Sequence, residues 1–181
     1  MAQPSSVVTV AQLDRIELDT LAAAYGMHVI DIGHGAPIPG SYWGESEAGL
    51  VADRLYVRAD TPAHSALHEL CHYVCMDDAR RAQLATDAGG SDDEECGVCY
   101  LEVLLADALS GFGRERCLAD MNSWGYSFRE GSADAWWAGD ARFARKWLLD
   151  RRLIDADDRP TFKLRGTSPR ELLFAINEVR R

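Results

Sequence analysis

The segment at residues 66–74, ALHELCHYV, contains the residues of this chain best suited to chemistry. His68 and His72 are four positions apart, and Glu69 directly follows the first of them. On a helix, residues four apart lie on one face, so both imidazoles can offer a ring nitrogen to one metal ion at about 2.0–2.1 Å. Glu69 lies about 100° around the helix, where its carboxylate can hold a water molecule beside that ion. The spacing therefore predicts two zinc ligands and a general base.

Two histidines do not complete a catalytic zinc site, because such a site takes three protein ligands and leaves the fourth position to water. The residues after His72 lack the third histidine of the longer H-E-x-x-H-x-x-G-x-x-H motif, so we expect a carboxylate from another element. The sequence SDDE at residues 91–94 is typical of a helix start, and it places Glu94 and Glu95 in the first turn. Either glutamate could be the third ligand.

The elements that must position these residues are predicted from hydrophobic spacing and turn residues. We expect helices at residues 10–25, 63–76, 91–110, 132–153 and from 168 onward, and short strands at 27–33, 41–44 and 50–58 with a bend at Asp53 and Arg54. Thr61 is expected to cap the second helix, with Pro62 in its first turn. Residues 77–90 are predicted to be a loop, and residues 159–166 a linker or an extra strand. The fold class is therefore α+β, with a small, mostly antiparallel sheet packed on helices and a helical C-terminal region.

Two segments of the chain resemble the paired signatures of the ImmA/IrrE metallopeptidases. These segments are TPAHSALHELCHYVCM at residues 61–76 and SDDEECGVCYLEVLLA at 91–106, and the family patterns are H-E-L-G-H and E-x-E-A-N-x-F-A-x-x-L-L-M-P. The resemblance extends over roughly residues 20–109 and places Glu95 on the metal-binding glutamate. It departs from the pattern at Cys71, where the family usually has glycine, and at Cys96 and Cys99. It implies a zincin-like core at residues 1–112, followed by a helical extension at 113–181 that packs on it as one domain.

The resemblance implies a zinc-dependent hydrolase that cuts a peptide bond in a protein substrate, for instance a transcriptional regulator such as a repressor. His68, His72 and Glu95 would bind zinc, and Glu69 would take a proton from the attacking water and pass it to the leaving amine. The strand at residues 55–58 is expected to form a sheet edge on which an extended substrate adds. The candidates for stabilising the oxyanion, each more typical of a structural or surface residue, are His34, Tyr73, Tyr100 and Tyr126.

Two other hypotheses remain open from the residues. One is a zinc-bearing regulatory module of the same fold that binds a partner without cutting it. The other is a redox sensor or structural zinc site built from Cys71 and Cys75 with Cys96 and Cys99, although buried packing suits these four residues better. His64, one turn before His68, is expected to be exposed or to support a ligand from behind rather than to bind the metal.

Composition limits the possible partners and compartments. The net charge of −10 and the absence of a basic stripe argue against direct binding of nucleic acid. No apolar run is long enough to span a bilayer, no signal peptide is evident, and five cysteines form an odd set, so we expect a cytoplasmic protein with reduced thiols. Acidic residues are concentrated at 77–95, which indicates a solvated face or an acidic mouth for cations or basic peptide. The tryptophans at 132–153 are expected in a helix buried on both faces rather than in a docking surface.

Overall fold

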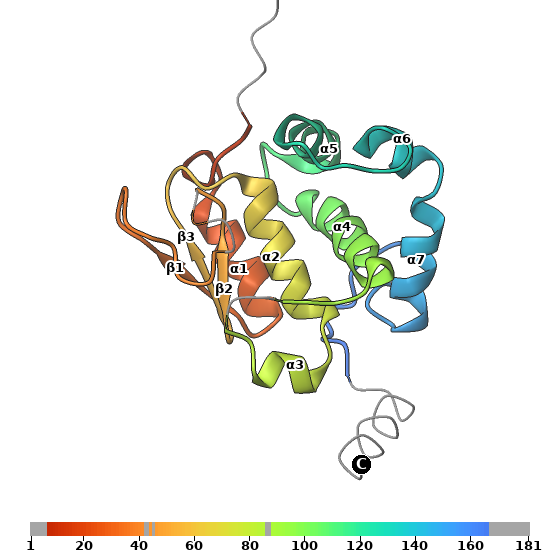
Figure 1. The fold of residues 1–181 in the computed structure, drawn as a ribbon, viewed down its shortest axis with the longest axis horizontal. Helices are drawn as coiled ribbons and strands as arrows, with labels where there is room; N and C mark the ends of the chain where they lie inside the picture. The colour runs from red at the N-terminus through yellow and green to blue at the C-terminus, as the bar shows by residue number, and fades with distance from the viewer. Residues whose placement is uncertain (1–6, 42–43, 45, 86–87, 167–181) are drawn as a thin grey trace, which may run out of the picture.

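The computed structural model describes residues 7–41, 44, 46–85 and 88–166, which form a mixed α+β structure (Figure 1). In chain order the elements are the 3-10 helix η1 (Val10–Gln12), α1 (Arg15–Ala24), β1 (His28–Asp31), β2 (Gly49–Val51), β3 (Arg54–Val57), α2 (Ala63–Cys75), α3 (Asp78–Ala82), α4 (Asp92–Ala106), α5 (Gly113–Trp124), α6 (Ala133–Ala138) and α7 (Ala141–Asp150).

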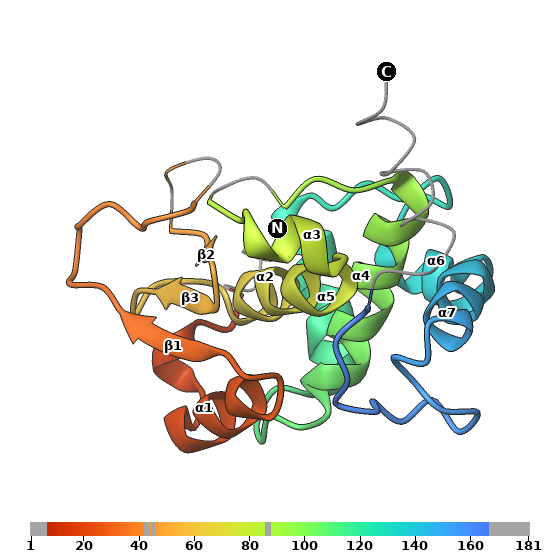
Figure 2. The same ribbon diagram turned by 90° about the horizontal axis from the view of Figure 1, so that it is seen from below.

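These elements pack in successive layers from the sheet to the last helix (Figures 1 and 2). Helix α1 packs beside β1, α2 packs on β2 and β3, and α4 lies along α2. On its other side, α4 contacts α5 and α7. One hydrophobic cluster runs through all of these layers, so the helices after residue 112 share a core with the sheet. Helices α2 and α4 are therefore in the middle of the molecule.

The sheet has the strand order β1-β3-β2, with β1 parallel and β2 antiparallel to the central β3. The prediction of a mostly antiparallel sheet is therefore wrong, because β2 lies between β1 and β3 in the chain and pairs with β3 as a hairpin, so that β1 pairs with β3 in the same direction. The prediction that residues 55–58 form a substrate-binding edge is also wrong, since both sides of β3 are already paired. The bend before β3 is found one residue early, at Ala52, which has φ +52°. Residues 42 and 43 of the strand expected at 41–44 lie outside the described residues.

The first predicted helix is interrupted after η1. The side chain of Asp14 accepts a hydrogen bond from the backbone N–H of Ile16 and so caps a separate helix, α1. The expected end is confirmed, because Gly26 takes the left-handed conformation with φ +75° just after α1.

Helix α2 begins at Ala63, and Pro62 is its N-cap residue. The expectation that Thr61 caps this helix is wrong, because its hydroxyl accepts a hydrogen bond from the N–H of Arg58 and closes the preceding turn instead. Most residues of α2 are buried, since the sheet, α4 and α5 cover it from different sides. A polar side chain on this helix therefore needs a partner from a neighbouring element.

The region predicted to be an acidic loop contains the short helix α3, capped by Asp77. The Ser91 side chain accepts from the N–H of Glu94 at 3.3 Å and begins α4, which confirms the predicted helix start. In a full capping box the Glu94 side chain would also accept from the Ser91 backbone N–H. Here the Glu94 carboxylate binds arginines instead. Helix α4 ends at Ala106, four residues before the expected end, where turns take over.

The C-terminal region differs most from expectation. Helix α5 was not predicted, and the single helix expected at residues 132–153 is divided into α6 and α7 at Gly139 and Asp140. Trp136 is buried, but Phe143 on α7 is 61% exposed, so α7 is covered on one face only. The helix expected from residue 168 lies outside the described residues.

Residues 159–166 form neither a linker nor an extra strand: Pro160 makes an isolated bridge with Ile154, and residues 161–166 are an irregular segment held against α2 and α4. The Arg165 backbone N–H donates to the carbonyl of Val74, and its buried guanidinium donates to the carbonyl of Cys75 and to Glu94. This segment therefore anchors the start of α4 to the end of α2. Within the described part of the chain, none of the helices has the length and apolar character required to cross a membrane.

Candidate metal centre

The two histidines of the HExxH segment lie on the face of α2 that meets α4. Their Nε2 atoms are 3.1 Å apart, and their rings meet edge to face. Both side chains are mostly buried, with 14% of His68 and 11% of His72 exposed. The predicted convergence of the two imidazoles is therefore present in the structure.

Glu95 joins them from the first turn of α4. One carboxylate oxygen lies 3.2 Å from Nε2 of His68, and the other lies 3.4 Å from Nε2 of His72. The two helices run antiparallel, so Glu95 at the start of α4 meets His72 near the end of α2. Two nitrogens and a carboxylate thus form a group that could hold one metal ion, and its members are the three ligands that the family resemblance implies.

The spacing of these atoms suits a tetrahedral ion. Ligand bonds of about 2.0–2.1 Å arranged tetrahedrally place neighbouring ligand atoms about 3.3–3.4 Å apart. The two Nε2 atoms are 3.1 Å apart and Oε1 of Glu95 lies 3.2 Å from Nε2 of His68, both close to that value, while the 3.4 Å contact with His72 is made by the other oxygen, Oε2. Imidazole and carboxylate are also the donors that zinc uses in catalytic sites. The residues present therefore fit zinc in both chemistry and spacing.

Glu94, the alternative ligand, faces away from the histidines. Its carboxylate accepts hydrogen bonds from Arg80 at 2.7 and 2.9 Å and from Arg165 at 2.8 Å. Only 4% of Glu94 is exposed, so this carboxylate is held by two arginines in the interior. Side chains of adjacent residues point about 100° apart on a helix. This difference in direction places Glu94 in ion pairs with arginines and Glu95 beside the histidines.

Glu102 holds the other nitrogen of His68. Its Oε2 lies 3.0 Å from Nδ1 of His68, and its Oε1 accepts a weaker hydrogen bond from the Cys117 thiol at 3.8 Å. Glu102 is fully buried, and burial raises its pKa while the bond to His68 lowers it, with a net rise. With the ring proton on Nδ1, Nε2 presents its lone pair toward His72 and Glu95. A buried carboxylate thus orients one predicted ligand.

Sequence reasoning did not assign Glu102 a role, although a signal was available. Glu102 is the only charged residue in the run at 98–106, and it follows Glu95 by seven positions, which places both on one face of α4. A lone acid in a buried helix face calls for a partner on the facing helix.

The charges of the metal-binding group are strongly coupled. Burial opposes ionisation of Glu95, but the hydrogen bond to His68 and the two histidine charges lower its pKa to about 2. Burial also opposes the charge on His68, yet the neighbouring Tyr126 and hydrogen bonds to Cys99, Glu102 and Glu95 raise its pKa well above the usual value. A cation or a proton is therefore strongly favoured between these side chains.

Glu69 is set apart from this group on α2, as the helix geometry predicted. Burial raises the pKa of its carboxyl to about 7, and the nearby carboxylates of Glu47, Glu95 and Glu102 add to the rise. The charge of His68 acts in the opposite direction. A carboxyl with a pKa near neutrality is suited to exchange protons with water, which is the property required of a general base.

Among the candidates for oxyanion stabilisation, Tyr126 alone packs on a predicted ligand. Its ring meets the His68 ring edge to face at 5.5 Å. The Tyr100 hydroxyl donates to Asp158, the Tyr73 ring lies under the guanidinium of Arg81, and His34 is exposed on the loop after β1. The structure thus keeps only Tyr126 beside the candidate centre.

His64 was expected either to be exposed or to support a ligand from behind. The first expectation is wrong, because His64 is fully buried. Its ring packs edge to face on Trp124 and Tyr126, and neither ring nitrogen has a hydrogen-bond partner in the described part of the chain. Burial lowers its pKa to about 3, with a smaller contribution from the charge of His68. His64 is therefore a neutral member of the aromatic wall behind His68.

The cysteines are free, and four of the five are buried, with Cys96 half-buried. Burial raises the pKa of Cys99 to about 12, and it also raises the pKa values of Cys71, Cys75 and Cys117. Cys99 belongs to a second group with Nδ1 of His68 and Glu102. Without a bound metal ion these thiols stay protonated at neutral pH, and their burial suits packing in the helix interface.

Comparison with known proteins adds no assignment: no family model matches the chain, and neither the curated proteins nor the solved structures that were compared give a match.

Proposed function

We propose that this chain is a zinc-dependent metallopeptidase that hydrolyses a peptide bond in a protein substrate, as its resemblance to the ImmA/IrrE family implies. The observation that carries the proposal is the approach of the Glu95 carboxylate to within 3.2 and 3.4 Å of the two Nε2 atoms of the HExxH helix. Helix periodicity alone brings the two histidines together, but the carboxylate comes from a segment more than twenty residues further along the chain.

Each residue of the centre has a role in this proposal. His68, His72 and Glu95 hold the zinc ion, which supplies a Lewis acid for the substrate carbonyl and lowers the pKa of a coordinated water to about 7. Glu69 accepts the proton of the attacking water and donates it to the leaving amine. Glu102 keeps the His68 ring in the orientation and tautomer that direct Nε2 toward the ion. Tyr126 packs edge to face on the same ring and limits its rotation.

The experiment that tests the proposal is the Glu69→Gln variant. Zinc content of the purified protein and hydrolysis of a quenched-fluorescence peptide library are measured together. We expect the variant to keep one zinc per chain, because Glu69 is not a ligand, and to lose hydrolysis by about 10²–10⁴-fold, because the proton acceptor is gone.

Glu115→Gln provides the matched control, since Glu115 is an exposed acid on α5 away from the centre. It should retain both zinc and hydrolysis. Wild-type turnover in Glu69→Gln, or a zinc-loaded wild type that cleaves no member of the library, would contradict the proposal.

A further inference from the structure

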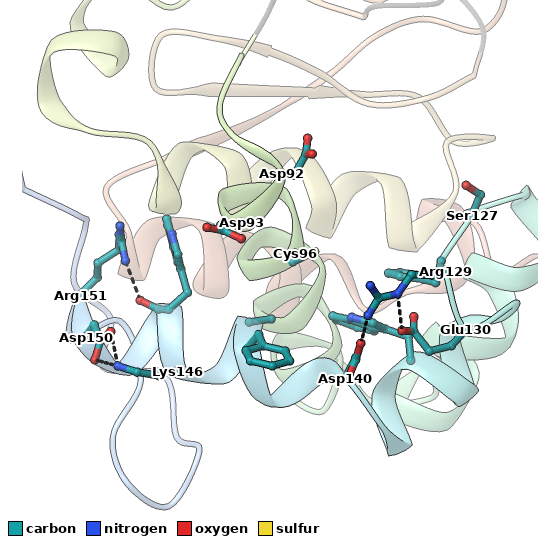
Figure 3. Close-up of a pocket in the computed structure, with 15 residues that line it drawn as sticks. Asp92, Asp93, Cys96, Ser127, Arg129, Glu130, Asp140, Lys146, Asp150 and Arg151 are labelled. Atoms are coloured by element: carbon teal, nitrogen blue, oxygen red, sulfur yellow. Dashed lines mark hydrogen bonds and ion pairs between the residues drawn. The ribbon is translucent and has the colours of Figure 1, made fainter.

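A groove of about 780 Å³ lies on the side of α4 opposite α2, between the first turns of α4, the segment at residues 127–130 and helix α7 (Figure 3). Asp92, Asp93 and Cys96 of α4 form one wall, as Figure 3 shows. Its volume is in the range of sites that take a small molecule or several side chains of a peptide. None of its residues belongs to the metal-binding group.

The groove has an aromatic end. Trp136 is 4% exposed and forms part of the floor, and Phe128 stacks on it with ring centres 4.6 Å apart. Phe143 of α7 also lines the groove, although 61% of it is exposed. Together these three aromatic rings border one hollow and offer apolar surface on which a large side chain can pack.

The charged residues of the groove leave an excess of acid. Three basic residues line it, and each is held by a groove neighbour: Arg129 by Asp140, Lys146 by Asp150, and Arg151 by the carbonyl and ring of Trp147. Within the described residues, Asp92 and Asp93 have no basic partner. Five acids line the groove against these three bases, so its net charge is negative, and the two acids without a basic partner among the described residues lie at its α4 end.

Two contacts connect the groove to the candidate metal centre. The first turn of α4 contributes Glu95 to the centre, and its neighbours Asp93 and Cys96 to the groove. Tyr126 packs on His68, and Phe128 of the groove stacks on Tyr126 with ring centres 6.5 Å apart. The groove and the centre therefore share the first turn of α4, and the Tyr126 side chain lies between Phe128 and His68.

We propose that this groove binds a segment of the substrate protein in which a basic side chain adjoins a large apolar one. The apolar side chain packs on Phe128, Trp136 and Phe143, and the basic group lies beside Asp92 and Asp93. The inference rests on the proposed peptidase function and gives it a substrate class. It also gives the C-terminal helices a role, since they supply most of the groove.

The test uses zinc-loaded Glu69→Gln protein, which cannot consume the ligand. Binding of a fluorescein-labelled decapeptide with phenylalanine and arginine at its centre, in a glycine and serine background, is measured by fluorescence anisotropy. Two matched peptides replace the arginine by glutamate or the phenylalanine by serine. We expect the phenylalanine–arginine peptide to bind about tenfold more tightly than either, and its affinity to fall with added salt.

Variants assign the binding to the groove. Asp92→Asn combined with Asp93→Asn should weaken the arginine peptide about fivefold and leave the glutamate peptide no weaker. Phe143→Ser should weaken binding about fivefold and abolish the preference for phenylalanine over serine. The controls are Asp19→Asn with Glu115→Gln, which remove two exposed acids elsewhere, and Phe162→Ser, which removes an aromatic residue 50% exposed outside the groove.

The outcomes separate this inference from the function on which it rests. Equal binding of all three peptides, or groove variants that behave like their controls, would overturn the inference even if the wild type hydrolyses peptides. Binding with the predicted dependence on the groove variants, in a protein whose wild type cleaves nothing, would support the groove as a peptide site and reject the peptidase.

Discussion

Glu94 and Glu95 are neighbours in one helical turn, yet one carboxylate contacts arginines and the other contacts imidazoles. Glu94 is buried between Arg80 and Arg165, which satisfy its oxygens and hold the first turn of α4 to α3 and to the segment at residues 161–166. Glu95 is half-exposed and faces two imidazoles whose nitrogens lie as close to each other as to its oxygens. The Glu94 carboxylate is already paired with two cations. The Glu95 carboxylate and the two imidazoles can together bind a further cation.

This difference distinguishes a structural acid from a candidate ligand. A buried ion pair with complete hydrogen bonds gains little from a further ligand, and removing one partner leaves an uncompensated charge. A convergent group of donors is held together only if a proton or a metal ion lies between them. Both glutamates lie beside positively charged groups, so the deciding feature is what those groups are: arginines keep their protons, whereas imidazoles can give up a proton and bind a metal ion.

The largest expected effect is on metal affinity. Glu95→Ala should weaken zinc binding about 10³-fold, because one of three protein ligands is removed. The measurement is competition with a chromophoric chelator at pH 7.5. Glu94→Gln serves as the control and should bind zinc within about threefold of wild type. If the two variants lose zinc equally, the distinction between the two glutamates is wrong.

For the free energy of unfolding the order of the two glutamates is reversed, and Glu94 is expected to matter more. Glu94→Ala should lower the free energy of unfolding of the zinc-free protein by about 3–5 kcal/mol, because Arg165 is left buried without its carboxylate. Urea denaturation of the zinc-free proteins measures it. Glu95→Ala should change this free energy by less than about 1 kcal/mol, since half of the Glu95 side chain is already in water. A larger loss for Glu95→Ala would mean that its role is structural.

The part of this centre that could be predicted from the sequence is the part that depends on short-range periodicity. His68 and His72 share a helix face whatever surrounds them, and Ser91 begins α4 through a local hydrogen bond. The choice between Glu94 and Glu95 rested on the family resemblance, because the arginine that buries Glu94 most fully comes from residue 165, far along the chain. The order of the strands and the break between α6 and α7 depend on tertiary packing in the same way.

Removing the support behind His68 should have a smaller effect than removing a ligand. Glu102→Ala should weaken zinc binding about 10–100-fold, because the His68 ring loses the carboxylate that orients it. The same chelator competition measures it, and Glu102→Gln should recover part of the loss, since an amide oxygen can still accept from Nδ1. Zinc affinity that is unaffected by Glu102→Ala would show that packing alone orients the ring.

His64 and His68 lie one turn apart on α2, and their pKa values are shifted in opposite directions. The pKa of His64 is lowered to about 3 in the folded protein, so below its ordinary value of 6.5 the unfolded chain binds a proton that the folded chain does not. Stability from neutral His64 is complete above pH 6.5 and is lost as pH falls toward 3. Between pH 7.5 and 5, wild type should lose about 2 kcal/mol more than His64→Leu in urea denaturation without zinc. Equal losses would place a titrating partner near His64.

The smallest effect is expected from the thiol on the buried side of His68. Cys99 forms a second group with His68 and Glu102, but it is packed in the helix interface, and Nδ1 of His68 is already held by Glu102. Cys99→Ala should therefore change zinc affinity by less than about threefold, in the same chelator competition. If this variant lost as much affinity as Glu95→Ala, the ion would lie on the Nδ1 side of His68, held by sulfur. The open side of the ring would then be free of metal, and the comparison between Glu94 and Glu95 would no longer identify the ligand.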